Sequence, residues 1–121
     1  MRFRTFKPQF APAVRNRIKR TTIRPTPKRM PKVGDRESWR QWLGKPYFSK
    51  TEELAQVELT EVKVITINLK GIMLADIVLE DAQQNDLAKA DCFTSFRDML
   101  GWFNSQYGLP ITGIFIQGED L

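Results

Sequence analysis

The segment Lys19-Arg20-Thr21-Thr22-Ile23-Arg24 places a candidate base, a candidate nucleophile and a fixed positive charge close together in the chain. A threonine hydroxyl becomes a nucleophile when a neighbouring group removes its proton. Lysine can accept that proton if burial and the nearby charges of Arg20 and Arg24 lower its pKa toward neutrality. Arg24 can hold a substrate oxygen or a phosphate, because a guanidinium stays charged and donates several hydrogen bonds. The segment therefore suggests catalysis by threonine or recognition of an oxygen-rich ligand.

The same residues have a purely structural interpretation. Lys19 and Arg20 are also ordinary surface charges where a strand begins, and Thr22 is a β-branched residue that favours strands. Asp91, far downstream, can simply cap a turn before the next helix. Clusters of titratable residues are often structural. The residue types alone leave both interpretations open.

The composition removes several classes of catalysis. The chain has no histidine, which excludes Ser-His-Asp and Cys-His mechanisms and the commonest zinc ligand. We therefore expect no metal and no other cofactor, and a catalytic base that is a lysine or a carboxylate. The single cysteine, Cys92, excludes an internal disulfide framework and is typical of a reducing compartment. Cys92 is a lesser candidate for a nucleophile, because the adjacent Asp91 disfavours its thiolate.

Charge is distributed unevenly along the chain. Residues 1–50 hold 15 Lys and Arg against 2 acids, whereas residues 51–121 hold 4 against 12, for a net charge of +5. Lys28, Arg29 and Arg36 fall in a proline-rich loop, residues 25–36, which is a candidate surface for phosphate contacts. The alternative is a solvated loop whose charge is neutralised by the acidic half in the folded protein.

Two tryptophans fall in the segment Glu37 to Leu43, which we expect to be extended. Trp39 and Trp42 would lie on opposite faces of a strand, so that one faces the interior. An exposed tryptophan beside Arg40 would stack on a base, whereas a buried one would only pack. We take Trp39 as the stacking candidate.

The elements that must position these residues are short. Pro8, Val14 and Ile18 predict a helix that Asn16 ends, and Ser95 with Asp98 predicts a capping box at the start of another. The apolar positions change parity between residues 55–59 and residues 62–64, which predicts a bulge near residues 60–61. The helix that Ser95 begins is predicted to span residues 96–106, and a third helix is predicted at residues 80–90. Further strands are predicted at residues 2–6, 20–24, 72–74 and 111–116.

The overall size suits one domain with one core. No apolar run reaches the 18 or more residues that a spanning helix needs, and no apolar region follows the basic N-terminus. We therefore expect a soluble cytoplasmic protein.

Several motifs, taken in order, resemble those of the ASCH family of small PUA-like domains. Lys-x-x-Thr-Ile-Arg at residues 19–24, a proline-rich loop and Gly34-Asp35 resemble the family's opening. Residues 88–95 are similar to its Ala-x-x-Asp-Gly-Phe-x-Ser, although Cys92 stands in place of glycine, and Arg17 likewise stands where members usually carry glycine. The resemblance runs from about Phe6 to Ile116, through these later matches at the family's spacing: Asp98-Met99, Trp102-Phe103, Tyr107-Gly108 and residues 113–116.

The resemblance implies an α+β fold, a PUA-like and mostly antiparallel β pseudo-barrel with two to three covering helices, as a single domain over residues 1–121. PUA-like relatives commonly bind RNA or modified bases, and some small bacterial ASCH proteins are amidohydrolases that deacetylate N4-acetylcytidine. If this chain is such an enzyme, the resemblance implies that Lys19 is the base and Thr22 the nucleophile. It implies that Asp91 is the proton donor, at a position where those enzymes carry glutamate.

We expect binding of RNA or a modified nucleoside in a basic pocket, with N4-acetylcytidine hydrolysis as the alternative. The candidates for contacting nucleic acid or substrate are Arg20, Arg24, Lys28, Arg29, Arg36 and Trp39.

Overall fold

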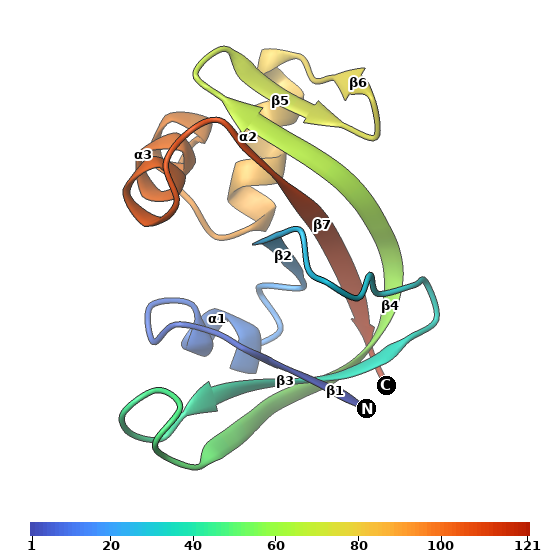
Figure 1. Ribbon diagram of the computed structural model, residues 1–121, viewed down its shortest axis with the longest axis vertical. Coiled ribbons are helices and arrows are strands. Elements are labelled where there is room, and N and C mark those ends of the chain that lie inside the picture. Colours follow the sequence, from blue (N-terminus) through green and yellow to red (C-terminus); the bar gives the residue numbers. More distant parts are fainter.

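A computed structural model describes all 121 residues. One strongly curved seven-stranded sheet forms the body of the fold, and three helices lie on its concave side (Figure 1). This confirms the predicted α+β class and the covering helices. The elements in order are β1 (Arg2–Thr5), α1 (Ala11–Arg15), β2 (Thr21–Pro25), β3 (Arg36–Trp42), β4 (Thr51–Asn68), β5 (Gly71–Leu74), β6 (Ile77–Val78), α2 (Asp81–Ala90), α3 (Phe96–Gln106) and β7 (Ile111–Asp120).

Strand β4 is long enough to belong to both halves of the curved sheet. Its first part pairs with β3, its second part pairs with β7, and its end pairs with β5. The register against β7 shifts between Leu59 and Glu61, where the predicted bulge bends the strand. Beyond the bulge, the core residues are Ile65 and Ile67, whereas Val64 is 54% exposed. The predicted position of the bulge is confirmed.

The curl is not closed by a continuous backbone ladder. Strand β1 pairs only with β3, in parallel, and β2 pairs only with β7, so both strands have a free edge. A side chain joins the two: Arg24 Nη2 donates to the carbonyl of Thr5 at 2.7 Å. We call the gap between β1 and β2 the seam.

Helix α1 begins later than predicted and ends at the predicted residue, Asn16. It begins at Ala11 rather than Pro8, with Pro12 in its first turn, where a missing N–H costs nothing. Asn16 ends the helix with φ −90°, and Arg17, the next residue, takes the left-handed φ of 63°. Ile18 is 70% exposed, so it is not part of the core face. The turn at residues 16–18 delivers Lys19 to the start of β2.

Helices α2 and α3 form nearly as predicted. Met99 and Phe103 of α3 enter a single core cluster of 17 buried residues. Ser95 caps α3 by accepting from the backbone N–H of Asp98 at 3.1 Å. The predicted capping box is wrong, however, because the Asp98 carboxylate accepts from the N–H and hydroxyl of Thr94 instead.

Trp39 belongs to the core rather than to a binding surface. Its side chain has no exposed area, packs on Phe6 and donates from Nε1 to Glu37 at 3.0 Å. The expectation that Trp39 stacks on a base is therefore corrected. A strand that is covered on its inner face buries its largest side chain there. Trp42, of opposite parity, is only partly buried and packs on Tyr47.

Glu37 is a buried carboxylate whose charge is compensated by Arg4, and we expect the stability it confers to be lost in acid. Burial alone would raise the pKa of Glu37, but two hydrogen bonds from Arg4, both 2.7 Å, and one from Trp39 outweigh it and hold the pKa below its usual range. As pH falls, the unfolded state therefore takes up the proton first, and stability falls as pH drops through the lowered pKa.

Urea unfolding of the wild type should show a steeper loss of stability between about pH 5 and pH 3 than that of Glu37→Gln, which has no carboxyl at this position. Parallel pH profiles for the two proteins would contradict the assignment of this loss to Glu37.

Candidate functional site

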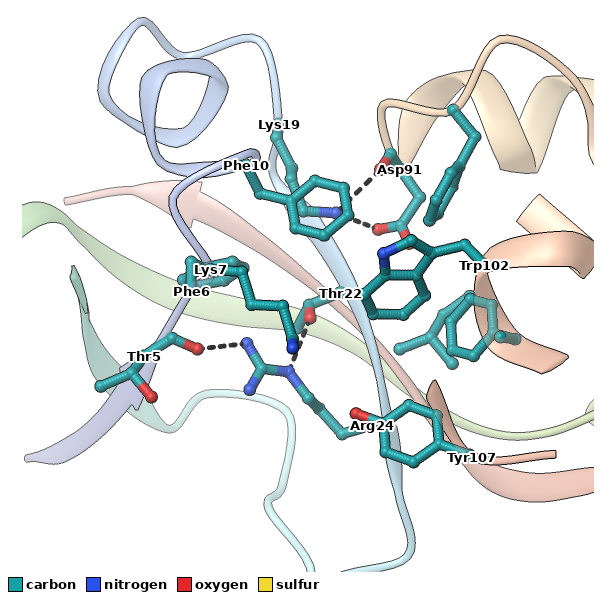
Figure 2. Close-up of a pocket in the computed structure, with 13 residues that line it drawn as sticks. Thr5, Phe6, Lys7, Phe10, Lys19, Thr22, Arg24, Asp91, Trp102 and Tyr107 are labelled. Carbon is teal, nitrogen blue, oxygen red and sulfur yellow. Dashed lines mark hydrogen bonds and ion pairs between the residues drawn. The ribbon is translucent and has the colours of Figure 1, made fainter. Parts of the chain in front are cut away.

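A small cavity of about 60 Å³ lies in the seam (Figure 2). The structure brings Lys19, Thr22 and Asp91 together here, although Asp91 is remote in the sequence. We call it the inner cavity. Thirteen residues line it: Thr5, Phe6, Lys7, Phe10, Lys19, Thr22, Ile23, Arg24, Asp91, Phe93, Trp102, Phe103 and Tyr107.

Lys19 and Asp91 form a buried ion pair. Lys19 lies just before β2, and its Nζ donates to Asp91 Oδ1 and, at 3.0 Å, to the backbone carbonyl of Asp91. Asp91 ends α2, and its Oδ1 also accepts from the hydroxyl of Thr21 at 2.9 Å. Cys92 follows with a left-handed φ of 69° and turns the chain away. Asp91 is therefore fixed by β2 and does more than cap its own helix.

Burial moves the pKa values of this pair toward each other. It lowers the pKa of Lys19, against the raising effect of Asp91, and Arg24 also lowers it. It raises the pKa of the Asp91 carboxyl, against the lowering effects of Lys19 and Thr21. Since desolvation penalises both charges, a proton moves from the ammonium to the carboxylate more readily than it would in water.

Thr22 and Arg24 project from the same face of β2. Arg24 Nε donates to Thr22 Oγ1 at 2.9 Å, and Nη2 makes the bond to Thr5 across the seam (Figure 2). Burial and the charge of Arg4 lower the pKa of Arg24 to about 10, so the guanidinium remains protonated at neutral pH. A charged donor stabilises an alkoxide on Thr22 more than it stabilises the hydroxyl.

The candidate base and nucleophile are not hydrogen-bonded to each other. Lys19 bonds to Asp91, and Thr22 bonds to Arg24. Transfer of a proton from Thr22 to Lys19 therefore requires the ammonium to lose its own proton and then to turn toward the hydroxyl.

Only one of the six predicted contact residues lines the inner cavity, and that residue is Arg24. Arg20 turns away, where it bonds to Asp120 at 2.7 and 3.0 Å and to two backbone carbonyls. Arg29 and Arg36 line a separate surface hollow with Arg2, and Lys28 lines neither site. Arg20 therefore has a structural role, and its prediction as a contact residue is corrected.

Aromatic rings supply the part of the site that the sequence interpretation missed. Phe10 lies 5.0 Å from Lys19 Nζ and packs edge-on against Trp102 at 5.4 Å. In the sequence, Trp102 and Tyr107 match ASCH motifs, but the pattern predicts no role for either residue. Helix α3 brings them to the seam, and no local pattern in the sequence indicates which strand edge a helix will cover.

A second, larger cavity of about 370 Å³ adjoins the first. It adds residues from the end of β3 and the loop after it, among them Gln41, Trp42 and Tyr47. We call it the outer cavity.

No group of three or more acidic or cysteine side chains is placed to hold a metal ion. None of the three helices is long and apolar enough to span a membrane. Comparison with protein-family models, with curated proteins and with solved structures finds no match. The ASCH resemblance therefore rests on the motifs in this chain alone.

Proposed function

We propose that this protein binds a modified nucleoside, free or within RNA, at the seam. The observation that carries the proposal is the convergence of a guanidinium, a buried Lys–Asp pair and several aromatic rings on one cavity. Small-ligand sites typically combine apolar walls with a few placed polar groups. The aromatic rings of the adjoining outer cavity suit a heteroaromatic base, and the polar groups of the inner cavity suit its carbonyl and amino functions.

The hollow lined by Arg2, Arg29 and Arg36 supports an RNA context. Arg2 donates to the backbone carbonyl of Arg29 at 2.9 Å, which orders this part of the loop. Arg36 is largely exposed, with only a distant contact to Glu58 at 3.8 Å. Exposed arginines gain affinity for phosphates by releasing counterions. Lys28, exposed on the same loop, would add to this attraction.

Hydrolysis of N4-acetylcytidine is the second candidate, and the electrostatics of the Lys19–Asp91 pair favour it. The reaction needs a neutral lysine and a protonated acid, and burial moves both pKa values in that direction. Neutral Lys19 would take the proton of Thr22, whose Oγ1 would attack the acetyl carbonyl. Asp91 would give its proton to the departing N4 amino group, and water would then hydrolyse the acetyl ester on Thr22.

Binding is tested by substituting two arginines in turn, Arg24 in β2 and Arg20 directly before β2. We expect Arg24→Met to weaken the affinity for N4-acetylcytidine by about 10- to 100-fold, because a charged hydrogen bond contributes about 1.5–3 kcal/mol. Arg20→Met is the matched control, since Arg20 bonds to Asp120 outside the cavity. Isothermal titration calorimetry on both variants gives the affinities, and circular dichroism confirms that each is folded.

Equal losses in the two variants, or no loss in Arg24→Met, would count against a site at the seam. Repeating the titration over a salt series separates the two forms of ligand. Affinity for RNA should fall steeply with salt, whereas affinity for the uncharged nucleoside should change little.

A further inference from the structure

The inner and outer cavities adjoin each other. They share five lining residues: Thr5, Phe6, Lys7, Arg24 and Tyr107. Arg24 and Tyr107 therefore stand at the junction, where each contacts the space on both sides. A ligand that extends from the outer cavity to Lys19, Thr22 and Asp91 would have to pass this junction.

The volumes decide what each cavity can hold. A cavity of about 150 Å³ accommodates benzene. The inner cavity, at about 60 Å³, is too small for a pyrimidine ring and large enough for a group of a few heavy atoms. The outer cavity, at about 370 Å³, lies in the size range of ordinary ligand sites.

The residues that line the two cavities also suit different parts of a ligand. The inner cavity ends at the buried Lys19–Asp91 pair and the hydroxyl of Thr22. Within the protein, Asp91 Oδ1 accepts hydrogen bonds from Lys19 and Thr21, whereas Oδ2 accepts none. Every fully buried polar side-chain atom has a hydrogen-bond partner, so Oδ2 is not fully buried. Oδ2 is therefore open to the cavity and can accept from a ligand N–H. A small polar group that carries both a carbonyl and an N–H matches this end.

The outer cavity shares Arg24 with the inner cavity but lacks the Lys19–Asp91 pair, and it adds the aromatic faces of Trp42 and Tyr47. Trp42 and Tyr47 pack against each other with ring centroids 5.3 Å apart, and Tyr47 is 84% exposed. Stacking of a base on an aromatic side chain contributes about 1–3 kcal/mol. Gln41 adds an amide beside these rings.

We infer that the two cavities divide one ligand: the outer cavity holds a planar heteroaromatic ring, and the inner cavity admits only a small polar substituent of that ring. The inference rests on the proposed nucleoside binding and adds a selectivity rule to it. A base without such a substituent occupies the outer cavity alone.

The three tryptophans of the chain make the division measurable, because each reports a different place. Trp42 lines the outer cavity, Trp102 lines the inner cavity, and Trp39 is fully buried in the core. The protein is labelled with 5-fluorotryptophan, and its three fluorine resonances are assigned with the variants Trp39→Phe, Trp42→Phe and Trp102→Phe. Spectra are then recorded with saturating cytidine, N4-acetylcytidine and acetamide.

Cytidine should shift the Trp42 resonance alone, N4-acetylcytidine should shift those of Trp42 and Trp102, and acetamide should shift that of Trp102 alone. Trp39 should not respond to any of the three. If the nucleoside is cleaved, the Trp102 resonance should return to its free position while that of Trp42 stays shifted.

A cytidine-induced shift of Trp102 equal to that caused by N4-acetylcytidine would overturn the division. So would N4-acetylcytidine shifting only one of the two resonances before any cleavage. If neither nucleoside shifts any resonance of the folded protein, nucleoside binding itself is refuted, and the inference is lost with it.

Discussion

Replacing Asp91 with alanine is expected to lower the free energy of unfolding by about 3–5 kcal/mol, because it leaves the ammonium of Lys19 buried without a counter-charge. Lys19 is only 2% exposed and cannot reach solvent without a rearrangement. Since small domains have total stabilities of about 5–15 kcal/mol, this is a large fraction of the whole. Urea unfolding at neutral pH, followed by circular dichroism, measures the difference.

The companion variant Lys19→Met should cost less. Asp91 then keeps the hydrogen bond from Thr21, and its raised pKa lets the carboxyl take up a proton rather than remain a buried charge. The double variant Lys19→Met/Asp91→Ala should recover most of the loss, because replacing both members of a buried pair is often neutral or stabilising. A double variant as unstable as the sum of the single changes would show that the two residues are not energetically coupled.

A stable double variant that no longer binds a nucleoside would show that the pair serves the site rather than the fold. Loss of binding without loss of stability is the expected signature of charges kept at an energetic cost.

Thr22→Val is expected to reduce N4-acetylcytidine turnover by at least about 1,000-fold if Thr22 is the nucleophile. Valine keeps the branched shape that suits β2 and removes only the hydroxyl, so the affinity for the nucleoside should stay within a few-fold. Turnover to cytidine is followed by absorbance, and affinity is followed by calorimetry.

Thr21→Val is the matched control for this change. It removes a hydroxyl from the adjacent residue of the same strand, and that hydroxyl bonds to Asp91 rather than to Arg24. We expect it to slow turnover by about tenfold, as loss of a positioning hydrogen bond does. Undiminished turnover in Thr22→Val would exclude a threonine nucleophile. No turnover in the wild type would exclude hydrolysis of this substrate and leave the binding proposal in place.

The sequence predicted the elements more reliably than it predicted the neighbours of each side chain. The bulge in β4 and the two later helices follow from local patterns, and those patterns act over a few residues. The strand predicted for residues 20–24 included Arg20, which alternation would put on the face of Thr22 and Arg24, yet Arg20 lies outside β2 and pairs with Asp120. Alternation holds only within a strand, and the sequence does not mark the residue at which the strand begins.

The site was only half visible for a related reason. The residue types of Lys19, Thr22 and Asp91 left a structural role open, and it was the ASCH resemblance that joined the three in one predicted site. Phe10 and Trp102 are ordinary core types, and only the docking of α1 and α3 on the seam makes them walls of a cavity. The bond of Lys19 to Asp91 rather than to Thr22 depends on a contact between residues 72 apart, which no local pattern encodes.

Arg17 and Cys92 hold left-handed backbone conformations on either side of the charged pair, one shortly before Lys19 and one directly after Asp91. A glycine in these positions would move freely among several conformations, whereas a residue with a Cβ has few alternatives. The left-handed conformation of each residue costs about 1–2 kcal/mol. Each residue also restricts the positions that the nearby charged residue, Lys19 or Asp91, can take. The backbone next to the ammonium of Lys19 and next to the carboxylate of Asp91 is thus conformationally restricted. Less conformational entropy remains to be lost when a ligand arrives, and some folding stability is exchanged for preorganisation of the site.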